Sequence, residues 1–230
     1  METQAYLTPE QGRVLEEATT RLVDQVLVRL HRRMGCRVGE ILGIAAEDFN
    51  FDVGLVTIIH EKTHIRILCP SCKKEVARKF KLCPYCGKDV GEAIEKALKS
   101  RKVRTIPIDQ STVKLVQHYL ANVKLPAQGR RHMLFPFNRQ RAYQIITEAA
   151  ARAGLPKIVN TESGKVHKVS SHRLRDAFAV NAVKKNDSGD GLRMLQEHLG
   201  HQNIGTTMRY RKVSGEELKQ WYDGVVQGDE

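Results

Sequence analysis

Two pairs of cysteines constrain this chain more than any other feature. Cys69, Cys72, Cys83 and Cys86 form C-P-S-C, ten intervening residues and C-P-Y-C. The short spacing lets both thiolates of a pair point at one metal ion, and four sulfur ligands from two tight turns suit tetrahedral zinc. Two disulfides are disfavoured in a reducing cytosol, and a thioredoxin-like site needs one C-x-x-C. We expect structural zinc, with rubredoxin-like iron as the alternative because the gap is short.

The composition is that of a folded, basic protein. The 230 residues include 38 Lys and Arg against 26 Asp and Glu, a formal net charge of +12, and 41% are hydrophobic. This content excludes disorder and allows one large domain or two small ones. The charge favours a polyanionic partner, nucleic acid before an acidic membrane. Because the sequence shows neither a transmembrane run nor a signal peptide, we expect a cytoplasmic protein.

Most of the basic excess lies around the cysteines. The segment from Lys62 to Arg104 holds thirteen Lys and Arg against four Asp and Glu, a local net charge of +9. The cysteine segment and its flanks are therefore the most basic part of the chain.

Apolar periodicity predicts a mainly helical chain with a small antiparallel sheet. A capping box at Thr8 and Gln11 begins one long helix that ends near Gly35. Further helices are predicted at residues 38–44, 111–123, 140–153, 174–185, 192–198 and 216–226, strands at 55–59 and 103–108, and a loop or loose hairpin at 154–170. The cysteines fall between the two strands, so the predicted class is α+β with a zinc-ribbon-like insertion, residues 64–100, in a β-hairpin.

Four short motifs occur in a telling order. G-C-R-V-G-E contains Arg37, H-x-x-R begins at His172, L-G-H ends at His201, and Tyr210 follows nine residues later. Over residues 8 to about 222 they resemble the boxes of the tyrosine recombinases, the phage integrase family. Four boxes in order are far more specific than any single motif. The resemblance implies the catalytic-domain fold of that family and a DNA strand transferase that acts as a site-specific recombinase.

The resemblance assigns roles that suit phosphoryl transfer. Arg37 and Arg175 match the two arginines that clamp the scissile phosphate, Glu40 matches the acidic residue that supports the first arginine, and Tyr210 matches the nucleophile. Guanidinium forks bind the non-bridging oxygens of five-coordinate phosphorus bidentately. The implied product is a 3′-phosphotyrosyl link, which another 5′-hydroxyl reverses without ATP or a catalytic metal.

The proton carriers come from the same resemblance. His172 would accept or position the phenolic proton, and His201 would hold the phosphate or orient the tyrosine. The family's lysine, which protonates the leaving 5′-oxygen, lies on a β-hairpin between the first two arginine boxes. We assign it to Lys62, with Lys99 and Lys102 on the returning strand as alternatives.

Two departures from the family stand out. Most members carry a core-binding domain before the first box, whereas about thirty residues precede Arg37, so we expect residues 1–230 to be a catalytic domain without one, either a fragment or a minimal enzyme. The second departure is the zinc insertion, which either staples a lengthened hairpin or adds phosphate contacts. The expected DNA-binding residues are Lys73, Lys74, Arg78, Lys79 and Lys102.

The expected partners are double-stranded DNA and further copies of the chain, since recombination in the family uses a tetramer, and no membrane. A type IB topoisomerase-like enzyme and a non-catalytic, zinc-stabilised DNA-binding protein are the alternative functions. The L-G-H box and the short T-T-x-x-Y spacing favour the recombinases, and the intact set of five catalytic side chains argues against a vestigial site.

Overall fold

A computed structural model of the chain describes residues 5–59, 67–77, 79–99, 103–128, 131–159, 164–211 and 222–224. Its helices are α1 (Pro9–Glu17), α2 (Leu22–Met34), α3 (Val38–Leu42), α4 (Gly91–Lys99), α5 (Gln110–Asn122), α6 (Arg139–Arg152), α7 (Ser171–Lys185), α8 (Gly189–Leu199) and α9 (Ile204–Met208). Its strands are β1 (Phe49–Asn50), β2 (Leu55–Ile59), β3 (Val103–Pro107), β4 (Ala127–Gln128), β5 (Arg131–His132), β6 (Ile158–Val159) and β7 (Val166–His167). The predicted fold class is confirmed.

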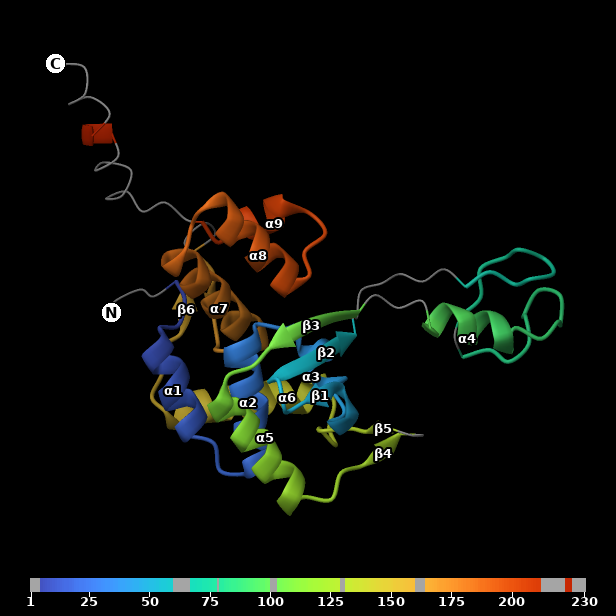
Figure 1. The fold of residues 1–230 in the computed structure, drawn as a ribbon, viewed down its shortest axis with the longest axis horizontal. Helices are drawn as coiled ribbons and strands as arrows, with labels where there is room; N and C mark the ends of the chain where they lie inside the picture. The colour runs from blue at the N-terminus through green and yellow to red at the C-terminus, as the bar shows by residue number, and fades with distance from the viewer. Residues whose placement is uncertain are drawn as a thin grey trace.

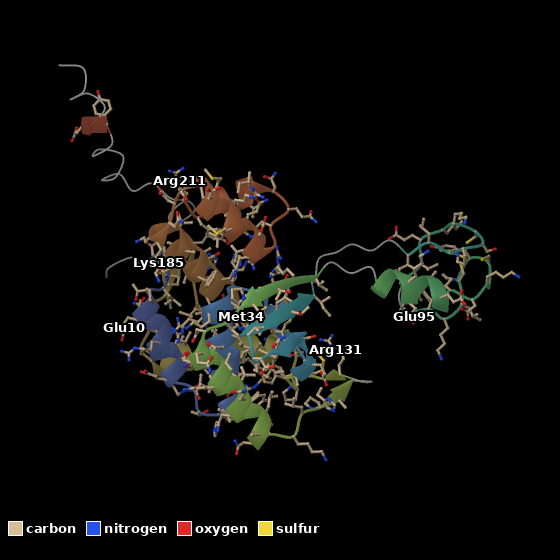
Figure 2. All side chains as sticks on the ribbon, in the orientation of Figure 1. Glu10, Met34, Glu95, Arg131, Lys185 and Arg211 are labelled. Carbon is tan, nitrogen blue, oxygen red and sulfur yellow. The ribbon has the colours of Figure 1, made fainter. Side chains whose placement is uncertain are left out.

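Helix α2 runs through the middle of the main body and contacts α1, α5 and α7 (Figure 1). Its apolar positions recur at helical spacing, so Leu27, Leu30 and Met34 all face the core and are fully buried. Met34 lies at the centre of the body (Figure 2). The two boxes that follow α2 and open α7 are therefore anchored on one core.

The three-stranded sheet has the order β1-β2-β3 and is antiparallel throughout. Val56 and Ile58 of β2 alternate inward and are fully buried, and β3 pairs with this strand so that Ile58 stands opposite Arg104. Cross-strand partners share a face of the sheet, so Arg104 lies on the buried face. The predicted strands at 55–59 and 103–108 are confirmed within a residue.

The prediction of one long N-terminal helix is wrong. The Thr8 capping box is present, but α1 ends at Glu17 and α2 begins anew at Leu22. The Thr19 hydroxyl donates to the carbonyl of Glu16 at 2.7 Å, a local hydrogen bond that competes with continued helix. The break lets α1 fold back, so buried Glu16 accepts from Arg29 Nε at 2.7 Å across the two helices.

The remaining predicted helices that can be compared are confirmed, with ends shifted by up to three residues. Pairing of β6 with β7 confirms a loose hairpin within 154–170. Helices α4 and α9 were not predicted, and most of the predicted helix at 216–226 lies outside the described residues. In the described part of the chain, the structure contains no helix long and apolar enough to span a membrane.

The cysteine segment lies between the paired strands and stands apart from the main body together with α4 (Figure 1). Ile59, the last residue of β2, pairs with Val103, the first of β3. The segment has its own small core, in which Ile67, Val76 and Val90 are buried with two of the cysteines. The sheet is thus continuous beneath the insertion.

Candidate active site

Arg175 connects three of the predicted boxes. It lies in the second turn of α7, and its side chain is buried. Its Nη1 donates to the carbonyl of Gly35 at 2.7 Å, and its Nη2 donates to the carbonyl of Leu199 at 3.0 Å and to Nε2 of His201 at 2.9 Å. Burial and the neighbouring charge of Arg37 lower the pKa of Arg175. The charge of Arg37 therefore acts on Arg175, and two neighbouring guanidinium groups suit the binding of an anion.

His201 is held by the turn that ends α8. Gly200 adopts a left-handed conformation with φ of 67°, which a residue without a Cβ tolerates best, and the chain reverses there. Since Nε2 of His201 accepts from Arg175, Nδ1 carries the proton and donates to the hydroxyl of Thr207 at 2.9 Å. Burial, and then the charge of Arg175, lowers the pKa of His201 to about 4. The imidazole is neutral at pH 7.

Tyr210 follows α9 and stacks on His201, with ring centroids 6.2 Å apart and planes inclined by 16°. Its hydroxyl donates to Oδ1 of Asp176 at 3.3 Å. Burial raises the pKa of Tyr210, the Asp176 carboxylate raises it further, and Arg175 opposes them. The phenol is therefore protonated and must lose its proton as it attacks.

Asp176 is a site residue that sequence reasoning missed. It directly follows Arg175 in the H-x-x-R box, and its Oδ2 accepts from Arg173 at 2.9 Å. His172, one helical turn earlier, brings Nε2 to 3.7 Å from the same oxygen, and 68% of its side chain is exposed. The structure thus places His172 at the rim, next to the carboxylate that contacts Tyr210. The i, i+4 spacing of His172 and Asp176 was the available signal.

A second missed residue, Arg104, supports Glu40. The Glu40 side chain is fully buried, and it accepts from Nη1 and Nη2 of Arg104 at 3.2 and 2.9 Å. It also accepts from Nη1 of Arg37 at 3.1 Å and from that residue's backbone N–H at 3.0 Å. Burial alone would raise the pKa of Glu40, but Arg104 and then Arg37 outweigh it and hold the pKa below its usual value.

The structure brings Arg37, Arg175, His201 and Tyr210 to one site, with Glu40 behind the first arginine. Lys62, Lys102 and Arg78 lie outside the described residues. Lys99 is the last residue of α4 and precedes the returning strand instead of lying on it. The assignment of the catalytic lysine therefore stays a prediction, as do the catalytic roles. Of the predicted DNA-binding residues, Lys73, Lys74 and Lys79 are exposed.

The four cysteines form one cluster. Their sulfur atoms all lie within 4.8 Å of one another, and the pairs Cys69–Cys86 and Cys72–Cys83 are each 3.6 Å apart. A tetrahedral zinc ion with about 2.3 Å bonds requires sulfur atoms about 3.8 Å apart. None of the four forms a disulfide. The donor set and its spacing fit a structural metal ion.

The two knuckles repeat one another, a signal that sequence reasoning overlooked. Residues 68–76 and 82–90 both read L-C-P-x-C-x-K-acidic-V. In each, the residue after the second cysteine has a positive φ, 59° at Lys73 and 70° at Gly87, and donates its N–H to the first cysteine's carbonyl. Gly87 tolerates this backbone conformation because it has no Cβ, whereas Lys73 adopts it without that freedom.

The sequence matches the model of the phage integrase family over residues 6–217. Tyrosine recombinase XerC of Syntrophus aciditrophicus is 29% identical over 208 residues, an alignment that covers 88% of this chain and 53% of XerC. The chain spans about half the length of the curated relatives it matches.

Solved structures share the fold at low sequence identity. The crystal structure of XerA recombinase gives a TM-score of 0.63 at 19% identity and covers 97% of this chain and 64% of XerA. XerH site-specific recombinase bound to its difH substrate gives 0.59 at 16%, covering 96% and 55%. The catalytic domain of bacteriophage HP1 integrase gives 0.53 at 20%, covering 96% and 94%. Because the family model matches residues 6–217, nearly the whole of this chain, the chain belongs to the phage integrase family, the tyrosine recombinases.

Proposed function

We propose that this chain cleaves and rejoins duplex DNA as a site-specific recombinase, through a 3′-phosphotyrosyl intermediate on Tyr210. The observation that carries the proposal is Arg175. Its guanidinium joins the first arginine box, the H-x-x-R helix and the L-G-H turn. It also lies near Arg37 and the phenol of Tyr210. Two cations, a neutral imidazole and a phenol at one point suit attack on a phosphodiester.

In this mechanism Arg37 and Arg175 bind the non-bridging oxygens of the scissile phosphate. The Tyr210 oxygen forms a bond to phosphorus as the bond from phosphorus to the 5′-oxygen breaks. The phenolic proton leaves toward Asp176, whose Oδ1 already accepts a hydrogen bond from the Tyr210 hydroxyl. The other carboxylate oxygen of Asp176, Oδ2, lies near Nε2 of His172. The leaving 5′-oxygen takes a proton from the lysine that we assign to Lys62, and reversal by another 5′-hydroxyl rejoins the strand.

A covalent adduct tests this function. The probe is a pool of nicked duplexes of randomised sequence. After cleavage the short fragment that carries the freed 5′-hydroxyl diffuses away, and its loss traps the covalent intermediate. We expect an SDS-resistant protein–DNA adduct that Tyr210→Phe abolishes, while Tyr143→Phe, at an exposed tyrosine of α6, keeps it. If the wild-type chain forms none with any sequence in the pool, the vestigial, DNA-binding alternative gains. Relaxation of supercoiled DNA without strand exchange would point to the topoisomerase alternative.

The partners follow from the same proposal. The structure of the Tn1549 transposon integrase in complex with transposon right end DNA supports DNA as the substrate. That this DNA is double-stranded, and that the chain self-associates on it, rests on the family resemblance. The match to 94% of the HP1 catalytic domain supports assigning residues 1–230 to a catalytic domain, with the insertion at 64–100. A DNA substrate of this kind agrees with a cytoplasmic location. Catalysis itself needs no metal in this scheme, because the two arginines supply the positive charge.

The cysteine cluster would hold zinc in a structural role. Its four ligands are Cys69, Cys72, Cys83 and Cys86, which leave no open position for chemistry on a substrate. The ion would fix the two knuckles relative to each other, since the core of this segment contains few apolar side chains.

The zinc segment would also bind DNA phosphates. Lys73, Lys74 and Lys79 are exposed on a segment that stands apart from the body, and Arg78 and Lys102 share its charge. Changing Lys73, Lys74, Arg78 and Lys79 together to Ala should weaken binding to a 30-base-pair duplex and reduce its dependence on salt. Lys114→Ala with Lys124→Ala, at exposed positions in and after α5, is the control. Unchanged affinity and salt slope would leave only the stapling role.

A further inference from the structure

Among the described residues, Arg104 is the one charged residue of the three-stranded sheet. It stands opposite Ile58 on the buried face, and only 11% of its side chain is exposed. Its two Nη atoms reach both oxygens of Glu40, and its Nε donates to the carbonyl of His198 at 2.9 Å. One guanidinium therefore joins two segments that carry the active site.

The first contact bears on Arg37. A fully buried carboxylate must be neutralised and hydrogen-bonded, because an unpaired buried charge is costly. Arg104 supplies two N–H groups to Glu40, so Arg37 does not have to satisfy this carboxylate alone. The Arg37 side chain remains 24% exposed at the site. Without Arg104, Glu40 would draw the Arg37 guanidinium inward and away from the phosphate.

The second contact bears on His201. The carbonyl that Arg104 binds belongs to His198, in the last turn of α8, and Nε2 of the same His198 ring donates to the carbonyl of Met34 at 2.8 Å. Three residues later comes His201, which contacts Arg175. Arg104 thus fixes the end of the helix that delivers the imidazole.

We propose that Arg104 is a positioning residue of the active site, which keeps Arg37 available for the phosphate and holds the L-G-H turn. The proposal rests on the proposed function for its consequence in cleavage. The anion site that Arg104 organises does not depend on cleavage, and phosphate binding measures it independently.

The test uses two readouts on the full chain. The first is the affinity for inorganic phosphate, followed by the NMR signals of the arginine Nε–H groups assigned to Arg37 and Arg175. The second is the rate of adduct formation with the pool of nicked duplexes. The variants are Arg104→Gln, Arg104→Lys and the double variant Arg104→Gln with Glu40→Gln.

The matched control is Arg29→Gln. Arg29, in α2, also bonds a buried carboxylate, that of Glu16 in α1, and its side chain is 16% exposed. It also donates to the hydroxyl of Ser111, and no hydrogen bond joins it to a predicted site residue among those described. This variant shows how much phosphate affinity and adduct rate change when a comparable buried ion pair is lost and only the stability of the fold is affected.

We expect Arg104→Gln to weaken phosphate binding at least about fivefold and to slow adduct formation on the order of 100-fold, the cost of a misplacement of about 1 Å. Affinity for the unnicked duplex should change less than about twofold. Arg104→Lys restores part of both losses because it neutralises Glu40, and so does the double variant because it removes the buried charge. Arg29→Gln should leave both readouts at the wild-type value.

Wild-type phosphate affinity and adduct rate in a folded Arg104→Gln protein would overturn the proposal, as would equal losses in Arg29→Gln. Should Arg104→Gln fail to fold, Arg104→Lys decides, because it keeps the charge but cannot form the fork, and wild-type values there also overturn the proposal. A third outcome separates the two proposals. If the wild-type chain forms no adduct, but phosphate affinity still falls from wild type through Arg104→Lys to Arg104→Gln, the recombinase function is refuted and the positioning role of Arg104 stands.

Discussion

At the scale of single residues, the site combines groups whose environments fix their protonation. Tyr210 is buried against the Asp176 carboxylate, which disfavours the phenolate, whereas Arg175 favours it. His201 is kept neutral by burial and by the arginine charges. The resting state is therefore a protonated phenol beside a neutral imidazole, and bound phosphate has to change the balance before the attack.

Asp176→Asn should lower the pKa of Tyr210. The carboxylate raises that pKa by its charge and by accepting the hydroxyl, and the amide removes the charge. The measurement is an NMR titration of ring-labelled tyrosine, with the signal assigned through Tyr210→Phe. Asp187→Asn, at an exposed carboxylate that pairs with Arg211, serves as the control and should leave it unchanged. A Tyr210 pKa that stays the same or rises in Asp176→Asn contradicts the contact.

At the scale of elements, α2 carries a buried histidine that makes the fold sensitive to acid. His31 donates from Nδ1 to the Leu27 carbonyl at 2.9 Å, and its Nε2 has no partner among the described residues. Burial lowers the pKa of His31 to about 4. The unfolded chain, with a pKa near 6.5, then binds a proton that the folded chain refuses, so stability present above pH 6.5 is lost as the pH falls toward 4.

His31→Leu should remove part of this loss. The change in unfolding free energy between pH 7 and pH 4 should shrink by about 3 kcal/mol, because the unfolded chain takes up this proton near pH 6.5 and the folded chain only near pH 4. Urea denaturation at a series of pH values measures it. The exposed His118→Gln is the control. An equal acid loss in His31→Leu and the wild type would show that other groups dominate.

We expect the order of the two cysteine knuckles to depend on a bound metal ion. We expect one zinc ion per chain by elemental analysis. A chelator should collapse the methyl NMR signals of Ile67, Val76 and Val90, because few apolar groups hold that core, while Val56 and Ile106 of the main body keep theirs.

Cys83→Ser should reproduce the chelator's effect at the same methyl groups. Cys36→Ala is its control, because that cysteine is buried in the main body and lies outside the cluster. Iron in place of zinc, or methyl signals that survive both treatments, would refute this interpretation.

At the scale of the whole molecule, the sequence predicted what is local or fixed by spacing. Helices and strands with clear periodicity were found within a few residues, and the H-x-x-R and L-G-H spacings identified side chains that the structure brings together. Arg104 was missed because it is one basic residue in a basic segment, and only the register of β2 with β3 places it beside Glu40. The break between α1 and α2 was missed because the apolar pattern continues through it.

The central claim is that Tyr210 is the nucleophile of a strand-cleaving enzyme. The most direct measurement is mass spectrometry of the trapped adduct after digestion with nuclease and protease. The site predicts a peptide in which Tyr210 carries a nucleotide through its 3′-phosphate. A nucleotide attached through its 5′-phosphate, or an adduct on any other residue, would contradict the claim.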